Sequence, residues 1–374
     1  MPISESTPLI SYNKINKEDY SLKNGKLFIF NIVTAYGNKG DLLINRALIE
    51  NLRNFGRVAV VTEHLPSHFL FELGLNEDEK CKTFGTCISQ NLFRYTIYKV
   101  GIPGHSFENE PQFLSACKEL IITAVFKYIF RFNFLRVGTS FGPTHKFKLK
   151  IEKIKAEMYL IYGLRDDSSV KLCSPSKMLY FPDLAFISSD IIKSDQENSD
   201  EGYYFLSFRA KFPEAAILDV YMTKIITKLE VFLKKSKIKS IVIGYQVSED
   251  KETSMKINSV LSRNKNLNIK FIDELLELQD SMLLISGASL VISNRLHVLL
   301  PSLIAGVPHI ALTDMSRHQK ISALYETIGA QFATHDITTH SEMEVVCENS
   351  PENLISIAQE QRKLALDILQ STIV

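Results

Sequence analysis

Residues 293–310 read SNRLHVLLPSLIAGVPHI, a stretch that begins at the end of one apolar run and leads into another. The run that feeds it, SLVIS (289–293), predicts a buried strand, and HIALT (309–313) predicts the next. Ligands of parallel sheets bind outside the carboxyl ends of the strands, so this stretch marks a candidate site as well as a fold. Three polar residues stand where the first strand ends: Asn294, Arg295 and His297.

The same alternation of apolar run and helical pattern recurs along the chain and predicts a doubly wound α/β architecture. Continuous apolar runs are typical of parallel strands that are covered on both faces. Other strands are predicted at 26–33, 57–63, 134–140, 157–164, 203–208, 239–245 and 268–273. Helices are predicted at 41–55, at 219–236 and at 350–369, where Ser350 is the expected N-cap and Pro351 the first helical residue.

The chain has 374 residues, which is enough for two domains of ordinary size. The polar run SSDIIKSDQENSDEG (188–202) ends in glycine and predicts the boundary between them. We therefore expect two Rossmann-like α/β domains that face each other across a cleft. The expected parts are an N-terminal domain at 1–190, a C-terminal domain at 191–350 and a terminal helix at 351–374 that packs back on the first domain.

The composition excludes several classes of protein. A net charge of +1 provides no general attraction for nucleic acid. The five cysteines are scattered and lack C-x-x-C spacing, which argues against a disulfide framework and a zinc site and favours the cytoplasm. The polar N-terminus lacks the apolar core of a signal peptide. For FKYIFRFNFLR (126–136) we favour core helix and strand over a membrane surface, so any membrane contact is expected to be peripheral.

Two segments near the expected strand ends have alternative interpretations. YGNKGD (36–41) offers helix N–H groups to an anion, or Gly40 simply makes the turn and Asp41 caps the helix. GTSFG (138–142) matches the G-x-S-x-G pattern of hydrolases, with Asp183 and His297 as the remaining triad members. We favour a plain loop there, because Pro143 interrupts the sharp strand-to-helix turn that such a nucleophile needs.

Charged residues follow three of the other expected strands. In LRDDSS (164–169), Arg165 and Asp166 either pair with each other at a strand end, or the segment is a salt-bridged helix start with Asp and Ser as caps. Arg209, in SFR, is a site residue or a solvated surface arginine. Arg295 and His297 point the same way if their segment is extended, although a buried histidine is often satisfied by the backbone alone.

Taken in order, these motifs resemble those of the polysaccharide pyruvyltransferase family. The resemblance covers roughly residues 30–330, and the order of the motifs is more specific than any one of them. The segment GTSFGP has fewer glycines than the corresponding loop of the family. Residues 64–133 match no motif of the family, and they are expected to determine which acceptor binds. The motifs are Asn38-Lys39-Gly40-Asp41, Gly142-Pro143, Arg165 to Ser169, Pro182 to Phe186, Ser207-Phe208-Arg209, Gln246 to Asp250, Arg295-Leu296-His297 and Lys320.

The resemblance implies a fold of the glycosyltransferase-B type and a transferase of polysaccharide or exopolysaccharide biosynthesis. Such an enzyme moves pyruvate from phosphoenolpyruvate to two hydroxyls of a sugar and forms a cyclic ketal. The acceptor is a sugar or glycan, which is free, nucleotide-linked or lipid-linked. Phosphoenolpyruvate is a co-substrate, and neither a metal nor an organic cofactor is expected.

The resemblance also assigns roles to residues. His297 is the expected general acid, Arg295 an anion clamp, and Asp41 the group that orients or deprotonates a sugar hydroxyl. Arg209, Arg295, Lys320 and Arg165 are the expected donor-binding residues, and Asn38, Gly40 and Asp41 the acceptor-binding ones. Two alternatives remain: a nucleotide-sugar-dependent glycosyltransferase of the same fold, and a non-catalytic carbohydrate-binding relative.

Overall fold

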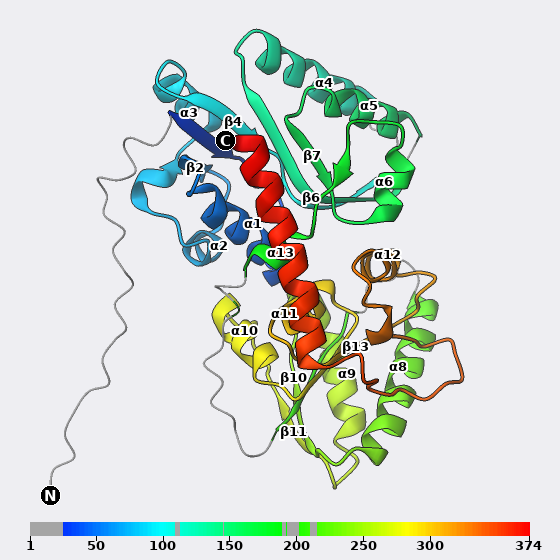
Figure 1. The fold of residues 1–374 in the computed structure, drawn as a ribbon. Coiled ribbons are helices and arrows are strands. Elements are labelled where there is room, and N and C mark those ends of the chain that lie inside the picture. The colour runs from blue at the N-terminus through cyan, green and yellow to red at the C-terminus, as the bar shows by residue number, and fades with distance from the viewer. Residues whose placement is uncertain (1–24, 109–112, 145, 189–191, 193–201, 210–214) are drawn as a thin grey trace, which may run out of the picture.

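The protein folds into two lobes, each built on one parallel sheet, in a computed structural model that describes residues 25–108, 113–144, 146–188, 192, 202–209 and 215–374 (Figure 1). We call residues 25–188 the N-terminal lobe and residues 202–336 the C-terminal lobe. Every strand pair in both sheets is parallel, and helices connect most of the strands.

The sheet of the N-terminal lobe has the strand order β3-β2-β1-β4-β6-β7-β8, with β5 paired to β6. Its strands are β1 (Lys26–Phe30), β2 (Arg57–Val61), β3 (Lys80–Cys81), β4 (Thr96–Val100), β5 (Gly104–Glu108), β6 (Asn133–Thr144), β7 (Ile161–Leu164) and β8 (Leu179–Tyr180). Its helices are α1 (Lys39–Leu52), α2 (Ser67–Glu72), η2 (Glu77–Glu79), α3 (Phe84–Asn91), α4 (Phe113–Tyr128), α5 (Lys146–Ala156), α6 (Asp167–Cys173) and η3 (Leu184–Ser188).

The sheet of the C-terminal lobe has the order β11-β10-β9-β12-β13-β14, so β9 and β12 lie at its centre. Its strands are β9 (Tyr204–Ser207), β10 (Ser240–Ile243), β11 (Asn268–Phe271), β12 (Leu290–Ser293), β13 (His309–Thr313) and β14 (Thr334–Asp336). Its helices are α8 (Ala215–Lys235), η4 (Ser248–Asp250), α9 (Lys251–Leu261), α10 (Leu278–Ser286), α11 (Leu296–Ile304), α12 (Gln319–Thr327) and η5 (Gln331–Ala333).

The predicted strands all exist, although most end earlier than their apolar runs. β13 spans 309–313 as predicted, and all five of its residues are buried, as a central strand between two helical layers requires. β1 ends at Phe30 rather than at residue 33. The sequence did not predict β3, β4, β5, β8 and β14, which are short or lie in the segment that matched no motif.

The prediction of a plain loop at GTSFG (138–142) is wrong. β6 runs without a break from Asn133 to Thr144, so Ser140 lies inside a strand. The sharp strand-to-helix turn of a hydrolase nucleophile is therefore missing at Ser140, whose side chain is buried against Arg165.

The terminal helix α13 (Pro351–Ile373) runs along both lobes (Figure 1). It begins as predicted, with the Ser350 side chain accepting a hydrogen bond from the backbone of Asn353. Its Gln361 accepts a hydrogen bond from the Tyr180 hydroxyl at 2.6 Å, so the helix does pack back on the N-terminal lobe. The predicted boundary at residue 190 lies outside the described residues and stays a prediction.

The aromatic run at 126–136 is only partly core. Phe132 and Phe134 are buried, whereas Tyr128, Ile129 and Phe130 at the end of α4 are exposed. No helix in the described part of the chain combines the length and the apolar character that crossing a bilayer requires.

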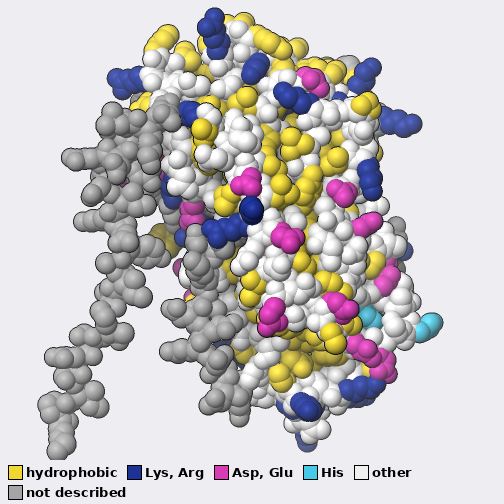
Figure 2. Space-filling view, viewed as in Figure 1, with side chains coloured by type: hydrophobic (Ala, Val, Ile, Leu, Met, Phe, Trp, Pro, Cys, Tyr) yellow, Lys and Arg dark blue, Asp and Glu magenta, His cyan; other side chains and the backbone are white. Residues whose placement is uncertain are grey.

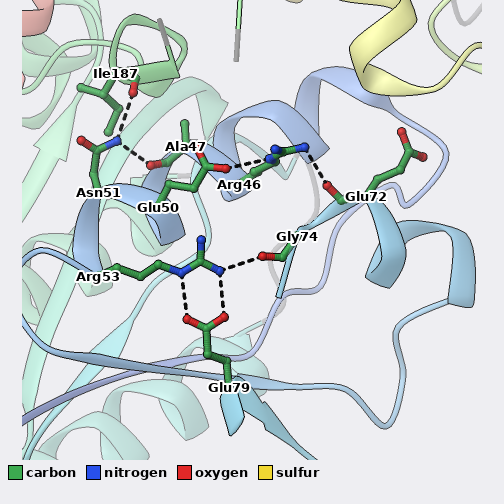
Figure 3. Close-up of polar contacts among 9 residues, drawn as sticks. All are labelled: Arg46, Ala47, Glu50, Asn51, Arg53, Glu72, Gly74, Glu79 and Ile187. Atoms are coloured by element: carbon green, nitrogen blue, oxygen red, sulfur yellow. Dashed lines mark hydrogen bonds and ion pairs between the residues drawn. The ribbon is translucent and has the colours of Figure 1, made fainter. Parts of the chain in front are cut away.

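A buried carboxylate links the two lobes. Glu72, at the end of α2, accepts a hydrogen bond from Lys39 Nζ at 2.5 Å and another from the backbone N–H of Leu278 at 2.6 Å. Lys39 opens α1, whereas Leu278 opens α10 of the other lobe, so one side chain joins both. Figure 3 shows the same stretch of α1, where Arg46 donates to the backbone carbonyl of Glu72 at 3.3 Å.

We predict that Glu72→Gln lowers the free energy of unfolding by about 3 kcal/mol, because it leaves the buried Lys39 ammonium without its carboxylate. The matched control is Glu50→Gln. Glu50 pairs with Arg46 on the half-exposed face of α1, and such a pair contributes about 0.5 kcal/mol or less. Urea unfolding measures both changes. Equal losses in the two variants would show that Glu72 does not hold the lobes together.

Candidate active site

The predicted site residues come together in one cavity of about 100 Å³ between the lobes. The N-terminal lobe contributes the start of α1 and the end of β7, and the C-terminal lobe contributes the ends of β9 and β12 and the start of α12. The carboxyl ends of the strands therefore supply the site, as expected for parallel sheets. The predicted residues that line it are Asn38, Asp41, Arg165, Arg209, Arg295, His297 and Lys320.

Helix α1 presents Asp41 to the cavity. The helix begins two residues earlier than predicted, and Asn38, not Asp41, is its N-cap, with its side-chain oxygen accepting from the Gly40 N–H at 3.0 Å. Asp41 therefore lies in the first turn, where the helix dipole favours a negative charge. Thr34 donates to its Oδ2 at 2.6 Å and fixes the carboxylate at the cavity wall.

Gly40 does not line the cavity but lies directly against His297. A Cβ atom at Gly40 would lie 2.2 Å from His297 Nδ1 and 2.6 Å from its Cβ, which no real structure tolerates. The backbone of α1 therefore approaches the imidazole of the other lobe more closely than any side chain permits.

His297 is largely buried, and its buried Nε2 atom has no hydrogen-bond partner within the part of the chain that is described. The nearest acid is Asp183, whose Oδ1 lies 3.9 Å from that atom. Burial lowers the pKa of His297 below 6.5, and Asp183 opposes this shift while Arg165 adds to it. The imidazole is therefore mainly neutral at neutral pH while the cavity holds no anion.

Arg295 is the extended residue just before α11, and it forms an ion pair with the buried Asp250. Its Nε has no hydrogen-bond partner among the described residues. Burial lowers the pKa of Arg295 and raises that of Asp250, since both charges are removed from water. Arg295 and His297 reach the same cavity, although His297 already belongs to a helix.

Arg165 pairs with Asp183 at 2.7 Å, so the predicted pairing with Asp166 is wrong. Asp166 is instead the N-cap of α6 and accepts from the Ser169 N–H at 2.7 Å. Asp183 thus faces both Arg165 and His297, which makes it the buried counter-charge on this side of the cavity.

Arg209 is half-buried rather than a solvated surface residue, and Asn294 fixes its backbone. The Asn294 side chain accepts from the Arg209 N–H at 2.6 Å and donates to the Arg209 carbonyl at 2.9 Å. This pair of bonds joins the ends of β9 and β12. The polar Asn294 at a buried strand end therefore has a structural role.

Lys320 and His318 enter the cavity from the start of α12. Burial is the main reason that the pKa of Lys320 falls to about 7, and the nearby Arg165 and Arg209 lower it further. Burial also lowers the pKa of His318 to about 4, and its ring stacks on Tyr221 with centroids 5.8 Å apart. Both shifts follow from positive charge concentrated in a water-poor cavity.

Sequence reasoning missed several groups of the site. Asp183 and Asp250 belong to motifs that were recognised, but nothing in their spacing indicates that they pair with Arg165 and Arg295. No feature of the sequence marked Gly104 as a site residue. His318 was marked only by its position two residues before Lys320. The sequence had marked Asn294 at the strand end but gave it no role in the transferase site. The residues in contact with the cavity or its arginines to which no such role was assigned are Gly104, Asp183, Gln246, Asp250, Asn294 and His318.

The cavity is suited to a small anion. Its described lining includes four cationic side chains and one acidic one. The cationic residues are Arg165, Arg209, Arg295 and Lys320, and the acid is Asp41. Guanidinium groups match phosphate and carboxylate oxygens in two-point contacts. Among the described residues, no group of three or more His, Cys, Asp or Glu is arranged to hold a metal ion.

Solved structures with the same fold share little sequence with this chain. UDP-GlcNAc 2-epimerase from Methanocaldococcus jannaschii is 13% identical, with a TM-score of 0.53, and the match covers 92% of this chain and 99% of that one. The S. aureus MnaA–UDP structure is 11% identical, with a TM-score of 0.50, covering 91% and 90%. These likenesses agree with a glycosyltransferase-B-like fold, in which two Rossmann-like units face a cleft.

No curated protein sequence matches this chain significantly. The sequence model of the family described as polysaccharide pyruvyl transferase matches residues 38–314, which is most of the chain and includes both walls of the cavity except His318, Lys320 and Ile321. The motif order, the fold and this match agree, and the chain therefore belongs to the polysaccharide pyruvyl transferase family.

Proposed function

We propose that this protein transfers pyruvate from phosphoenolpyruvate to two hydroxyls of a sugar in a polysaccharide or its precursor and forms a cyclic ketal. The observation that carries the proposal is the buried, unpartnered Nε2 of His297 in a cavity lined by four cationic side chains. A proton donor among fixed cations suits a substrate that is both anionic and activated by protonation.

The donor is bound by charge. Phosphoenolpyruvate carries a phosphate and a carboxylate, and Arg165, Arg209, Arg295 and Lys320 surround the space available for them. Asp183 and Asp250 hold Arg165 and Arg295 from behind, so these guanidinium groups are oriented before the donor arrives. The unpartnered Nε of Arg295 remains to be satisfied by a donor oxygen.

Binding of the donor itself favours the protonated form of His297, the proposed general acid. His297 is mainly neutral in the empty cavity because burial lowers its pKa. A bound anion with several negative charges raises that pKa again, so the imidazolium forms when there is a substrate to protonate. Catalysis is thereby coupled to donor binding.

The reaction balances without a further reactant. His297 gives a proton to the methylene carbon of phosphoenolpyruvate, and a sugar hydroxyl adds to the neighbouring carbon while losing its own proton. The proton of the first hydroxyl restores His297. The second hydroxyl then attacks the same carbon and gives up its proton, the bond between that carbon and the phosphate oxygen breaks, and the phosphate leaves with the electron pair and takes up that proton. Asp41, at the wall formed by α1, is the proposed group that orients or deprotonates the hydroxyl, and Asn38 lies beside it.

The proposed reaction uses phosphoenolpyruvate as a co-substrate and needs no separate cofactor. The acceptor is a sugar or glycan, as the family implies. We also propose a cytoplasmic location, because the cysteines are scattered in the sequence and lack the pattern of a disulfide framework.

The decisive experiment measures phosphate release from phosphoenolpyruvate with a panel of sugar acceptors, and mass spectrometry of the product. His297→Ala is expected to lower kcat by about a hundredfold to ten-thousandfold, the usual effect of losing a general acid. The exposed His340→Ala is the matched control and should retain full activity. Wild-type turnover of a nucleotide-sugar, with no turnover of phosphoenolpyruvate, would overturn the proposal in favour of a glycosyltransferase.

We predict that Gly40→Ala loses about a hundredfold or more in kcat, although alanine is the better helix former. The added methyl overlaps the ring and Cβ of His297 and must displace the acid from its position. Gly37→Ala is the control, because a Cβ there meets nothing within 4 Å. A Gly40→Ala enzyme with normal kcat would mean that the position of His297 does not matter for the reaction.

We predict that kcat/KM for phosphoenolpyruvate falls as the pH rises through about 7. This ratio reports ionisations of the free enzyme, and Lys320, with a pKa of about 7, loses its charge over that range. Lys320→Gln should have a lower kcat/KM at every pH and should lack this step. If the step persists in Lys320→Gln, another group is responsible for it.

A further inference from the structure

Helix α4 presents an apolar stripe to solvent at the edge of the N-terminal lobe. Leu114, Ile121 and Tyr128 are 81%, 63% and 72% exposed, and they recur every seven residues on one face. Ile129, just after the helix, is 70% exposed, and Ile122 and Val125 add to the same surface. We call these six residues the α4 stripe.

The α4 stripe is not needed for the core. The opposite face of the helix buries Thr123 and packs Phe126 against Phe84 and Phe132, with ring centroids 6.0 and 4.9 Å apart. Glu119 pairs with the buried Lys155 of α5 at 2.9 Å. The helix is therefore held by one face while its outer face keeps large apolar groups, which soluble surfaces rarely gather in one place.

Positive charge surrounds the α4 stripe. Residues 113–156 contain nine Lys or Arg and two Glu, a local net charge of +7 in a chain whose total is +1. The two acids, Glu119 and Glu152, are both engaged in ion pairs with Lys155. Figure 2 shows hydrophobic and Lys or Arg side chains together along the upper edge of the molecule, where α4 lies in Figure 1. The exposed cations are Lys118, Arg131, Lys146 and Lys150.

We infer that the α4 stripe and its basic rim dock on an anionic lipid bilayer. Apolar side chains enter the headgroup boundary while lysines and arginines contact lipid phosphates, which is the pattern of peripheral membrane helices. A second copy of the chain fits less well, because a two-fold interface would bring two strongly positive surfaces together. The inference does not depend on the proposed reaction, since binding is measured without donor or acceptor.

The test is co-sedimentation of the full chain with phosphatidylcholine vesicles that contain or lack phosphatidylglycerol. The wild type should sediment with the anionic vesicles, less so at high salt, and weakly or not at all with pure phosphatidylcholine. Ile121→Glu/Ile129→Glu should weaken binding about tenfold or more, and so should Lys118→Glu/Lys150→Glu. All four positions are exposed, and thermal unfolding checks that each variant remains folded.

Two control pairs make the test specific to this surface. Val220→Glu/Val231→Glu adds the same charge at exposed valines of α8, and Lys237→Glu/Lys265→Glu reverses two exposed lysines elsewhere in the C-terminal lobe. Both should bind vesicles like the wild type. The inference is overturned if the wild type does not bind anionic vesicles. It is also overturned if the control variants lose as much binding as Ile121→Glu/Ile129→Glu and Lys118→Glu/Lys150→Glu. It is also overturned if the wild type is a dimer that Ile121→Glu/Ile129→Glu separates while vesicle binding is absent.

Discussion

The close approach of Gly40 to His297 is the constraint on which the rest of the site depends. It brings the start of α1 in one lobe against the start of α11 in the other, with no room for even a methyl group between them. The bridge from Lys39 through Glu72 to the backbone of Leu278 holds the same two lobes beside it. Asn38 and Asp41, on either side of Gly40, line the same cavity as His297.

The electrostatics of the cavity follow from bringing the lobes together. Each lobe contributes an arginine with its own buried acid: Arg165 with Asp183, and Arg295 with Asp250. These acids allow the guanidinium groups to be buried, but they leave Arg209 and Lys320 in excess around the cavity. The low pKa of Lys320 and of His297 reflects an environment that disfavours further positive charge until an anion enters.

The cavity and the α4 stripe use charge differently. In the cavity, the cations are few and partly or fully buried, and acids orient two of them, Arg165 and Arg295, which favours one small ligand held in one geometry. Around the α4 stripe, Lys118, Arg131, Lys146 and Lys150 are exposed beside apolar side chains, which favours an extended partner with no single geometry. Both belong to a chain with almost no net charge, so neither is visible in its composition.

The sequence by itself determined the α/β class, the strand that ends at Ser293, the caps of α13 and the set of cationic residues, because periodicity, apolar runs and motif order are local properties. The sequence did not determine which residues contact one another in the folded chain. The pairing of Arg165 with Asp183 and the course of β6 through Ser140 depend on residues from other elements of the fold. Above all, the motif explains the glycine at position 40 only as a turn residue and gives no steric reason for it. Only the tertiary structure supplies one, since the space that a side chain would need there is already filled by His297 from the other lobe.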